Sequence, residues 1–267
     1  MIPRVALIGL PTDVNSSFLR GPAKAPAIVR DMIWSDKGNM GTELGGEIGT
    51  DFELVDRGEV ALSEGEGDDL RIEQAVAACL DAGDIPISIG GDHSVTYPVM
   101  RAIAARHGPP AILHIDAHPD LYDELDGNRR SHASPFARIM EEGQASRLVQ
   151  VGIRTLNAHQ RQQAERFGVE ILPMRGFRTD DVPRLDGPVY VSIDIDGLDP
   201  AFAPGVSHHE PGGLGVREVM DILAAIEGQV IGGDVVEYNP DRDINEMTAS
   251  VAAKLARELA ALAARRR

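Results

Sequence analysis

Short apolar runs recur along the chain, and they constrain its fold more than any other feature. They are continuous rather than alternating, which is typical of strands buried on both faces of a parallel sheet. The runs cover residues 5–10, 85–89, 111–115, 148–153, 169–172, 189–195 and 229–232. Stretches with helical spacing lie at residues 70–80, 97–106, 135–142, 158–167, 216–226 and 249–264. This order predicts an α/β fold, a three-layer sandwich with a mostly parallel central sheet. No linker divides the chain, so we expect residues 1–267 to form a single domain.

The charge balance narrows the range of partners. The chain carries 42 acidic and 26 basic residues, for a formal net charge of −16. We therefore expect no nucleic-acid partner, because neutralising phosphates takes clustered lysine and arginine, whereas a negative field attracts small cationic ligands. The single cysteine, Cys79, excludes an intrachain disulfide and is typical of a reducing compartment. The sequence shows no signal or membrane-spanning stretch, so we expect a cytoplasmic protein without a membrane partner.

Residues of the types that bind metals follow three of the predicted strands. In open α/β sheets, ligands bind beyond the carboxyl ends of the strands. The residues concerned are His93, Asp116, His118, Asp120, Asp194 and Asp196. We expect the four aspartates to project into one cleft, and His114 to face the opposite side of its strand and pack in the core. Glycine pairs follow two of the strands, and Gly91 is expected to let the backbone turn ahead of His93.

Four carboxylates in one cleft repel one another unless positive charge lies among them. Two divalent cations would balance the four negative charges. Oxygen-rich ligation with only two imidazoles favours Mn²⁺ over a structural Zn²⁺, which prefers cysteine and histidine. The sequence therefore predicts a site for two Mn²⁺ per chain.

Four ordered segments carry a resemblance to a known family. They are residues 90–94 (GGDHS), 116–120 (DAHPD), 192–200 (SIDIDGLDP) and 237–240 (EYNP). They resemble the signature segments of the ureohydrolases, the arginase and agmatinase family, and the likeness covers nearly the whole chain. Residues 131–140 and 199–208 make the likeness closest to plant-type arginases. The resemblance implies an arginase-like fold and a homo-oligomer, either a trimer or a hexamer.

The resemblance also implies how the metals are held. In this family six residues bind a manganese pair, and all six matching positions are occupied here by the expected types. Asp116 and Asp194 would bridge the two ions. His93 with Asp120 would complete one site, and His118 with Asp196 would complete the other.

Catalytic and substrate-binding roles are implied in the same way. Glu237 matches the glutamate that pairs with the guanidinium, and His132 matches the histidine that shuttles a proton to the leaving amine. With Asp120, these are the predicted catalytic residues. Asn128 lies in the segment where family arginases place polar groups for the amino-acid head, so Asn128, Glu237 and His132 are the predicted substrate-binding residues. His208 is expected to have no metal role.

The predicted function is that of a binuclear manganese amidinohydrolase, which splits a guanidino substrate into urea and an amine. A guanidinium carbon is a poor electrophile, and a metal pair supplies a strong nucleophile by lowering the pKa of water. The likeness points to L-arginine, with ornithine as the product. Agmatine, which gives putrescine, and other guanidino acids are the alternatives within the class. A catalytically silent metal-binding relative is the alternative outside it.

Overall fold

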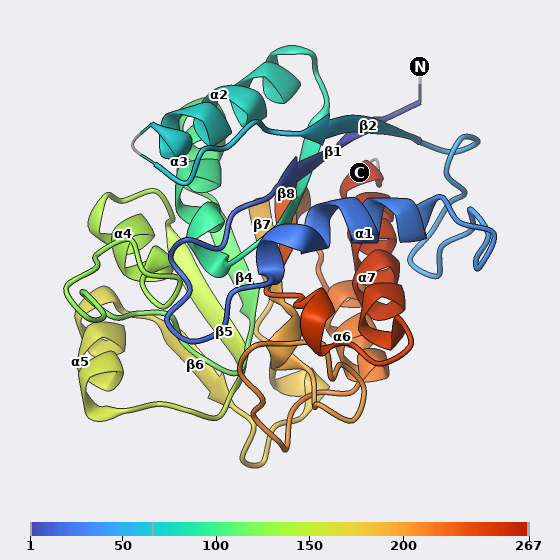
Figure 1. Ribbon diagram of the computed structural model, residues 1–267. Helices are drawn as coiled ribbons and strands as arrows, with labels where there is room; N and C mark the ends of the chain where they lie inside the picture. The colour runs from blue at the N-terminus through green and yellow to red at the C-terminus, as the bar shows by residue number, and fades with distance from the viewer. Residues whose placement is uncertain (1, 66, 266–267) are drawn as a thin grey trace.

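Eight parallel strands form the centre of the molecule in the computed structural model, which describes residues 2–65 and 67–265 (Figure 1). Every pairing between these strands is parallel. The strands are β1 (Arg4–Leu10), β2 (Glu53–Glu59), β3 (Ile85–Gly90), β4 (Ala111–Ile115), β5 (Arg147–Ile153), β6 (Glu170–Pro173), β7 (Pro188–Asp194) and β8 (Gln229–Val236). Their spatial order is β2-β1-β3-β8-β7-β4-β5-β6.

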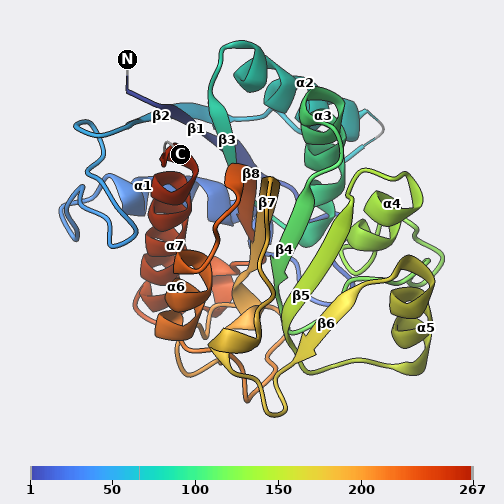
Figure 2. The same ribbon diagram turned by 180° about the vertical axis from the view of Figure 1, so that it is seen from behind.

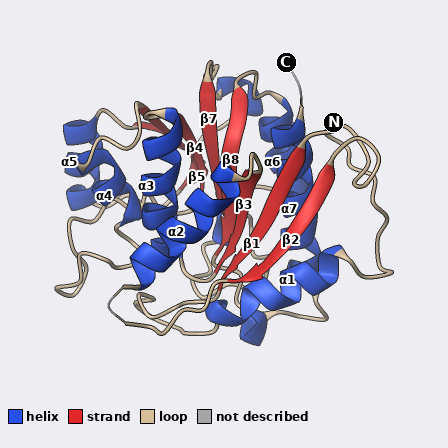
Figure 3. Ribbon diagram, turned by 90° about the horizontal axis from the view of Figure 1, so that it is seen from above, coloured by secondary structure: helices blue, strands red, loops and turns tan. Residues whose placement is uncertain are grey.

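Helices cover both faces of this sheet, which confirms the predicted three-layer sandwich (Figures 2 and 3). One face is covered by α1 (Ala25–Ile33), α6 (Val216–Ala224) and α7 (Met247–Ala264). The other is covered by α2 (Asp68–Asp81), α3 (Thr96–His107), α4 (Pro135–Glu141) and α5 (Ala158–Phe167). A hydrophobic core lies on each face of the sheet, and successive side chains of a strand point alternately into one core and the other. Val5 and Leu7 pack on the α1/α7 side, whereas Ala6 and Ile8 pack on the α2/α3 side.

Two elements were not predicted from the sequence. Strand β2 lies at the edge of the sheet, and Leu54 is its one buried side chain, so it lacks the apolar run of the inner strands. Helix α1 carries Pro26 in its first turn, where proline is tolerated, but the surrounding Gly-Pro and Ala-Pro pairs are typical of a loop.

Strand β8 is longer than predicted because its glycine pair lies within the strand rather than after it. At Gly233 a Cβ would lie 2.5 Å from the carbonyl oxygen of Val191 on the neighbouring strand. Glycine is therefore required there by a close approach of two backbones. The longer strand carries Asp234 into the buried centre of the sheet.

Strands β3, β8, β7 and β4 are adjacent in the sheet, and their carboxyl ends meet at one edge. The four segments singled out in the sequence follow these four strands. Cys79 lies buried in α2, away from that edge. Among the described residues, no helix has the length and apolarity needed to cross a bilayer.

Candidate active site

The structure brings all six predicted metal ligands together at the carboxyl edge of the sheet. They form two overlapping groups that share Asp116. In the first, Nδ1 of His93 lies 3.1 Å from Oδ2 of Asp120, 3.1 Å from Oδ2 of Asp194 and 3.3 Å from Oδ2 of Asp116. In the second, Nδ1 of His118 lies 3.1 Å from Oδ2 of Asp196 and 3.4 Å from Oδ1 of Asp116.

A buried hydrogen-bond chain fixes which nitrogen of His93 faces these carboxylates. The Ser192 hydroxyl donates to Oδ1 of Asp234 at 2.6 Å, so its oxygen accepts from Nε2–H of His93 at 2.9 Å. Asp234 also accepts from the hydroxyls of Tyr190 and Thr96. Nδ1 of His93 therefore points at three carboxylates, and this buried atom has no hydrogen-bond partner among the described residues. An imidazole held in this way is suited to bind a metal ion.

Among the residues that the structure describes, no lysine or arginine forms an ion pair with the aspartates of this cluster. Burial raises the pKa of Asp194 well above its ordinary value, and the negative charges of Asp196 and Asp116 raise it further. Burial likewise raises the pKa of Asp196 to about 6, against the opposing effect of His118. Burial disfavours a charged His93, but the carboxylates around Nδ1 outweigh it and raise the pKa of its imidazole. The centre attracts positive charge, and cation binding would relieve the repulsion.

A cavity of about 570 Å³ opens above the cluster. Its inner wall includes His118, Asp120, His132, Asp194, Asp196 and Glu237. Glu237 follows β8 directly, with a left-handed φ of 63°. Its carboxylate accepts from the backbone N–H of His93 at 2.9 Å and from Nδ1 of His132 at 2.8 Å.

Glycine at position 91 permits this arrangement because two backbone segments approach each other closely there. The N–H of Glu237 donates to the carbonyl of Gly91 at 2.9 Å. A Cβ on Gly91 would lie 1.8 Å from the carbonyl oxygen of Thr12, so no other residue fits between the loop after β1 and the end of β3. The chain also bends at Gly91 between β3 and His93, as expected, and the close approach adds a second requirement for glycine there.

The pair formed by His132 and Glu237 is held in the charged state. Burial disfavours the imidazolium, but the adjacent carboxylate of Glu237 outweighs it and raises the pKa of His132 to about 9. The positive imidazole in turn overcomes the effect of burial and lowers the pKa of Glu237. The cavity thus holds a protonated imidazole and an ionised carboxylate side by side at neutral pH.

Comparison with known proteins identifies the family. The sequence model of the Arginase family matches residues 3–261. This chain belongs to the arginase family. It is 50% identical to the Arabidopsis thaliana protein named Arginase 1, mitochondrial, over 96% of this chain and 80% of the relative. It is 34% identical to the human protein named Guanidino acid hydrolase, mitochondrial, over 95% of this chain and 76% of the relative. The solved structure of arginase from Medicago truncatula matches with a TM-score of 0.91 and 43% identity, covering 98% of this chain and 88% of that one.

The relatives correct one expectation about this arginase-family chain. The sequence, with one cysteine and no evident signal, predicts a cytoplasmic protein. That prediction is wrong, because the similar plant proteins are named as mitochondrial or chloroplastic. A low cysteine count indicates a reducing environment, but it does not distinguish one reducing compartment from another.

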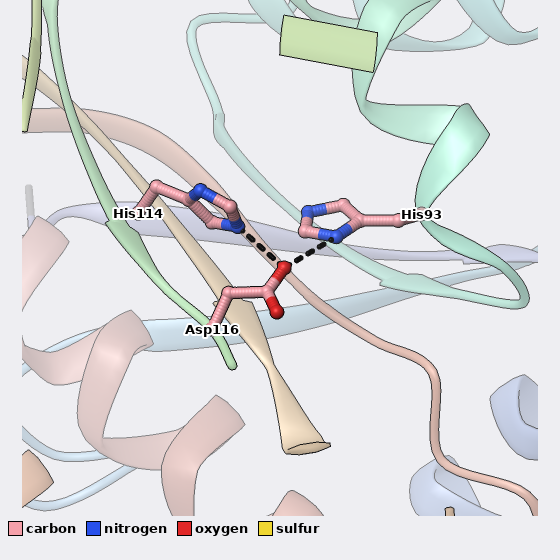
Figure 4. Close-up of side chains that lie close together, drawn as sticks. All are labelled: His93, His114 and Asp116. Carbon is pink, nitrogen blue, oxygen red and sulfur yellow. Dashed lines mark hydrogen bonds and ion pairs between the residues drawn. The ribbon is translucent and has the colours of Figure 1, made fainter. Parts of the chain in front are cut away.

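A second correction concerns His114, which was expected to point away from the ligands. Its Nε2 lies 2.8 Å from Oδ2 of Asp116, so Asp116 stands between His114 and His93 (Figure 4). Residues two apart in extended backbone share a face, so His114 belongs with Asp116. Gln150 donates to Nδ1 of His114 at 3.0 Å, and burial lowers the pKa of this imidazole. The neutral ring therefore carries its proton on Nε2 and donates it to Asp116.

The structure does not bring Asn128 to the cavity. Its Nδ2 donates to Oδ1 of Asn15 at 3.0 Å, and its Oδ1 accepts from the N–H of Arg130 at 2.8 Å. Both ends of the amide are used within the loops, and Asn128 is absent from the cavity lining.

Other residues form the outer wall of this arginase-family cavity. They include Ser17, Tyr122, Arg154, Asn157, His208 and Glu210. The His208 ring lies 5.3 Å from that of His132, and burial lowers its pKa. None of these six was predicted to bind substrate. The available signal was weak: Ser17 follows the first strand and so lies at the carboxyl edge, but nothing in its local sequence marks it.

Proposed function

We propose that this protein hydrolyses L-arginine to ornithine and urea with two Mn²⁺ per chain. The observation that carries the proposal is the position of Glu237. Its buried, ionised carboxylate lies in the wall of the cavity that also exposes the aspartates of the ligand cluster. A guanidinium paired with Glu237 would lie directly over that cluster. The 50% identity to a plant arginase favours arginine over the other guanidino compounds.

The residues of the cluster fit the proposed metal pair. His93, Asp116, Asp120 and Asp194 would hold one ion, and Asp116, His118 and Asp196 the other. A bridging role for Asp194 follows from the family resemblance, and its place in the first group is compatible with that role. When bound, the ions supply Lewis acidity and lower the pKa of water, so that a nucleophile exists at neutral pH.

The chain's own residues account for binding and proton transfer. Glu237 pairs with the guanidinium and holds its carbon over the cluster. His132, which is protonated below about pH 9, supplies the proton that the departing amine requires. Asp120 contributes through the metal cluster, 3.1 Å from Nδ1 of His93.

The outer wall offers one neutral and one anionic group for the amino-acid head of arginine. The Tyr122 hydroxyl accepts from Nδ2 of Asn157 at 2.5 Å, which leaves its own proton for a ligand carboxylate. Glu210 is an anion suited to an α-ammonium group. Arg154 is not free to bind a carboxylate, because its guanidinium donates to backbone carbonyls, including those of Asp196 and Glu210.

Urea release decides among the candidate substrates. Purified protein loaded with Mn²⁺ should release urea from arginine with a higher kcat/KM than from agmatine, 4-guanidinobutanoate or guanidine. Metal analysis should give about two ions per chain, as four balancing carboxylates require. A preference for agmatine would replace the arginine assignment, and no urea from any compound would favour a silent metal-binding relative.

A single substitution tests the role of Glu237. Glu237→Gln should fold and keep its metals but lose kcat/KM on the order of 10²–10⁴-fold, since breaking a buried charge pair from one side costs about 3–5 kcal/mol. Glu210→Gln, which alters a carboxylate of the outer wall, is the matched control and should change mainly KM. Full turnover by Glu237→Gln would refute the pairing with guanidinium.

We also propose that residues 1–267 form one catalytic domain and that the protein is a homo-oligomer, a trimer or a hexamer. The apolar side chains of Trp34, Ile244 and Met247 are 42%, 55% and 47% exposed near the packed ends of α1 and α7. Light scattering would measure the mass in solution, and a monomeric mass would refute the assembly.

A further inference from the structure

His132 has only one nitrogen through which it can exchange a proton with the cavity. Its Nδ1 is 2.8 Å from Oε1 of Glu237 and is committed to that ion pair. Its Nε2 lies 2.8 Å from Oγ of Ser17. A proton leaving the imidazole therefore leaves from Nε2, and the first acceptor it meets there is the Ser17 hydroxyl.

Two anchors hold the loop that carries Ser17. Upstream, Asn15 uses all its polar groups: its N–H donates to Asp92, its Nδ2 to Ser94, its carbonyl accepts from the N–H of His132, and its Oδ1 accepts from Asn128. The loop and the backbone of His132 are thus fixed to each other two residues from Ser17.

After Ser17, residues 20–23 are anchored by a buried carboxylate, that of Asp13. It accepts from Nε of Arg20 at 2.6 Å and from the N–H groups of Gly21 and Ala23 at 2.6 and 3.2 Å. With both ends fastened, the segment between them presents Ser17 to His132 without depending on a bound ligand.

The two serines of this loop differ in what they contact. Ser17 lines the cavity and contacts His132. The Ser16 hydroxyl is buried and makes no hydrogen bond with any residue that the structure describes. Only one of two adjacent hydroxyls is thus connected to the imidazole, and that one is also open to the cavity.

We propose that Ser17 relays the proton between Nε2 of His132 and the cavity, an inference that rests on the proposed arginine hydrolysis. Oγ of Ser17 accepts the proton from Nε2 while its own hydroxyl proton passes to the departing amine nitrogen. The serine gains one proton and gives up one, the imidazole becomes neutral, and the amine leaves as the neutral product. Water in the cavity then returns a proton by the same route. The hydroxyl also keeps the ring oriented over the reacting groups.

Substitutions at position 17 separate a relay from a merely structural role. Ser17→Ala should lower kcat by about 10–100-fold, somewhat less than the effect of deleting the acid itself, with little change in KM and with metal content unchanged. Threonine and valine have nearly the same shape and differ in the hydroxyl. Ser17→Thr should therefore keep most of kcat, and Ser17→Val should fall with Ser17→Ala.

Ser16→Ala is the matched control and should turn over like the wild type. Equal kcat values for Ser17→Thr and Ser17→Val would overturn the relay, as would a wild-type kcat in Ser17→Ala. If Ser17→Ala fails to fold, the threonine–valine pair still decides the question. Failure of the proposed function is recognised separately, because the wild type would then release no urea from arginine.

Discussion

The floor of the cavity and its outer wall are built in different ways. The ligand cluster lies beneath the cavity and forms its floor; there His93, Asp116 and Asp194 lie at or within three residues of the ends of inner strands and are at most 2% exposed. On the outer wall, Tyr122, Asn157 and Glu210 come from loops and retain contact with solvent. We therefore expect the sheet to fix the groups that would perform the chemistry and the loops, which in proteins generally tolerate more sequence change, to select the substrate.

The largest effect should come from the residue shared by both ligand groups. Asp116→Ala removes a carboxylate common to the two groups, so we expect it to lose bound metal and to lower kcat/KM on the order of 10⁴-fold, in keeping with the several kcal/mol that metal ions contribute. Metal analysis and urea release measure both effects. If the variant kept two ions and turned over like the wild type, the proposal that the floor residues perform the chemistry would be refuted.

His132 lies between the floor and the outer wall, and its substitution should cause the next largest loss of activity. His132→Ala should lower kcat by about 10²–10⁴-fold, as expected for a lost general acid, and leave the metals bound. The pH dependence of stability supplies a second measurement. Because the pKa of folded His132 is raised from 6.5 to about 9, its stabilising pair with Glu237 is present below pH 6.5 and is lost as the pH rises through 9.

The free energy of unfolding of wild type minus that of His132→Ala should therefore be largest below pH 6.5 and shrink toward pH 9. A difference that grows with pH would contradict the ion pair. Normal turnover with only a lowered melting temperature would assign His132 a purely structural role.

A smaller effect, on metal affinity, is expected from Gln150, which does not itself belong to the ligand cluster. Gln150 donates to His114, and His114 contacts Asp116. The sequence places His114 in the core, which implies that altering it leaves metal binding intact; because His114 contacts Asp116 in the structure, we instead expect its surroundings to affect metal affinity. Gln150→Leu removes the donor that fixes the His114 tautomer, so Mn²⁺ affinity should weaken by about 10–100-fold. Gln163→Leu, a buried glutamine of α5 outside the cavity, is the control. Equal affinities by calorimetric titration would show that His114 only fills space.

The smallest effect belongs to the outer wall. Tyr122→Phe removes one hydroxyl donor from the proposed carboxylate contact, so KM for arginine should rise about 2–10-fold with kcat nearly unchanged. KM for agmatine, which lacks the carboxylate, should not change. An equal rise for both substrates would show that Tyr122 does not distinguish them.

The same contrast explains which features the sequence predicts. The inner strands and the ligand cluster are predictable because burial and metal chemistry restrict the residue types at strand ends, as in the segment from Asp116 to Asp120. Strand β2 and helix α1 lack a continuous apolar run and were missed. His114 was assigned to the wrong face by an error of spacing rather than by a lack of information.

The loops resist prediction for a different reason. Ser17 meets His132 across 115 positions of sequence, and Asn128 meets Asn15 across 113. Such contacts depend on how loops that are distant in sequence are arranged in space beyond the sheet. The local pattern of apolar and polar residues does not predict that arrangement. The sequence therefore predicts the chemistry of the site in more detail than its substrate.

The order of strands has a consequence for how the protein is made. His93 and Asp116 lie in the segments just after β3 and β4. In the sheet these two strands are separated by β7 and β8, which are the last strands to be synthesised. On the ribosome, the early strands can pair only as two separate sets, β2-β1-β3 and β4-β5-β6. The halves of the ligand cluster join when residues 188–236 have emerged and inserted between them. Metal loading would thus be a late event in biogenesis, coupled to completion of the sheet.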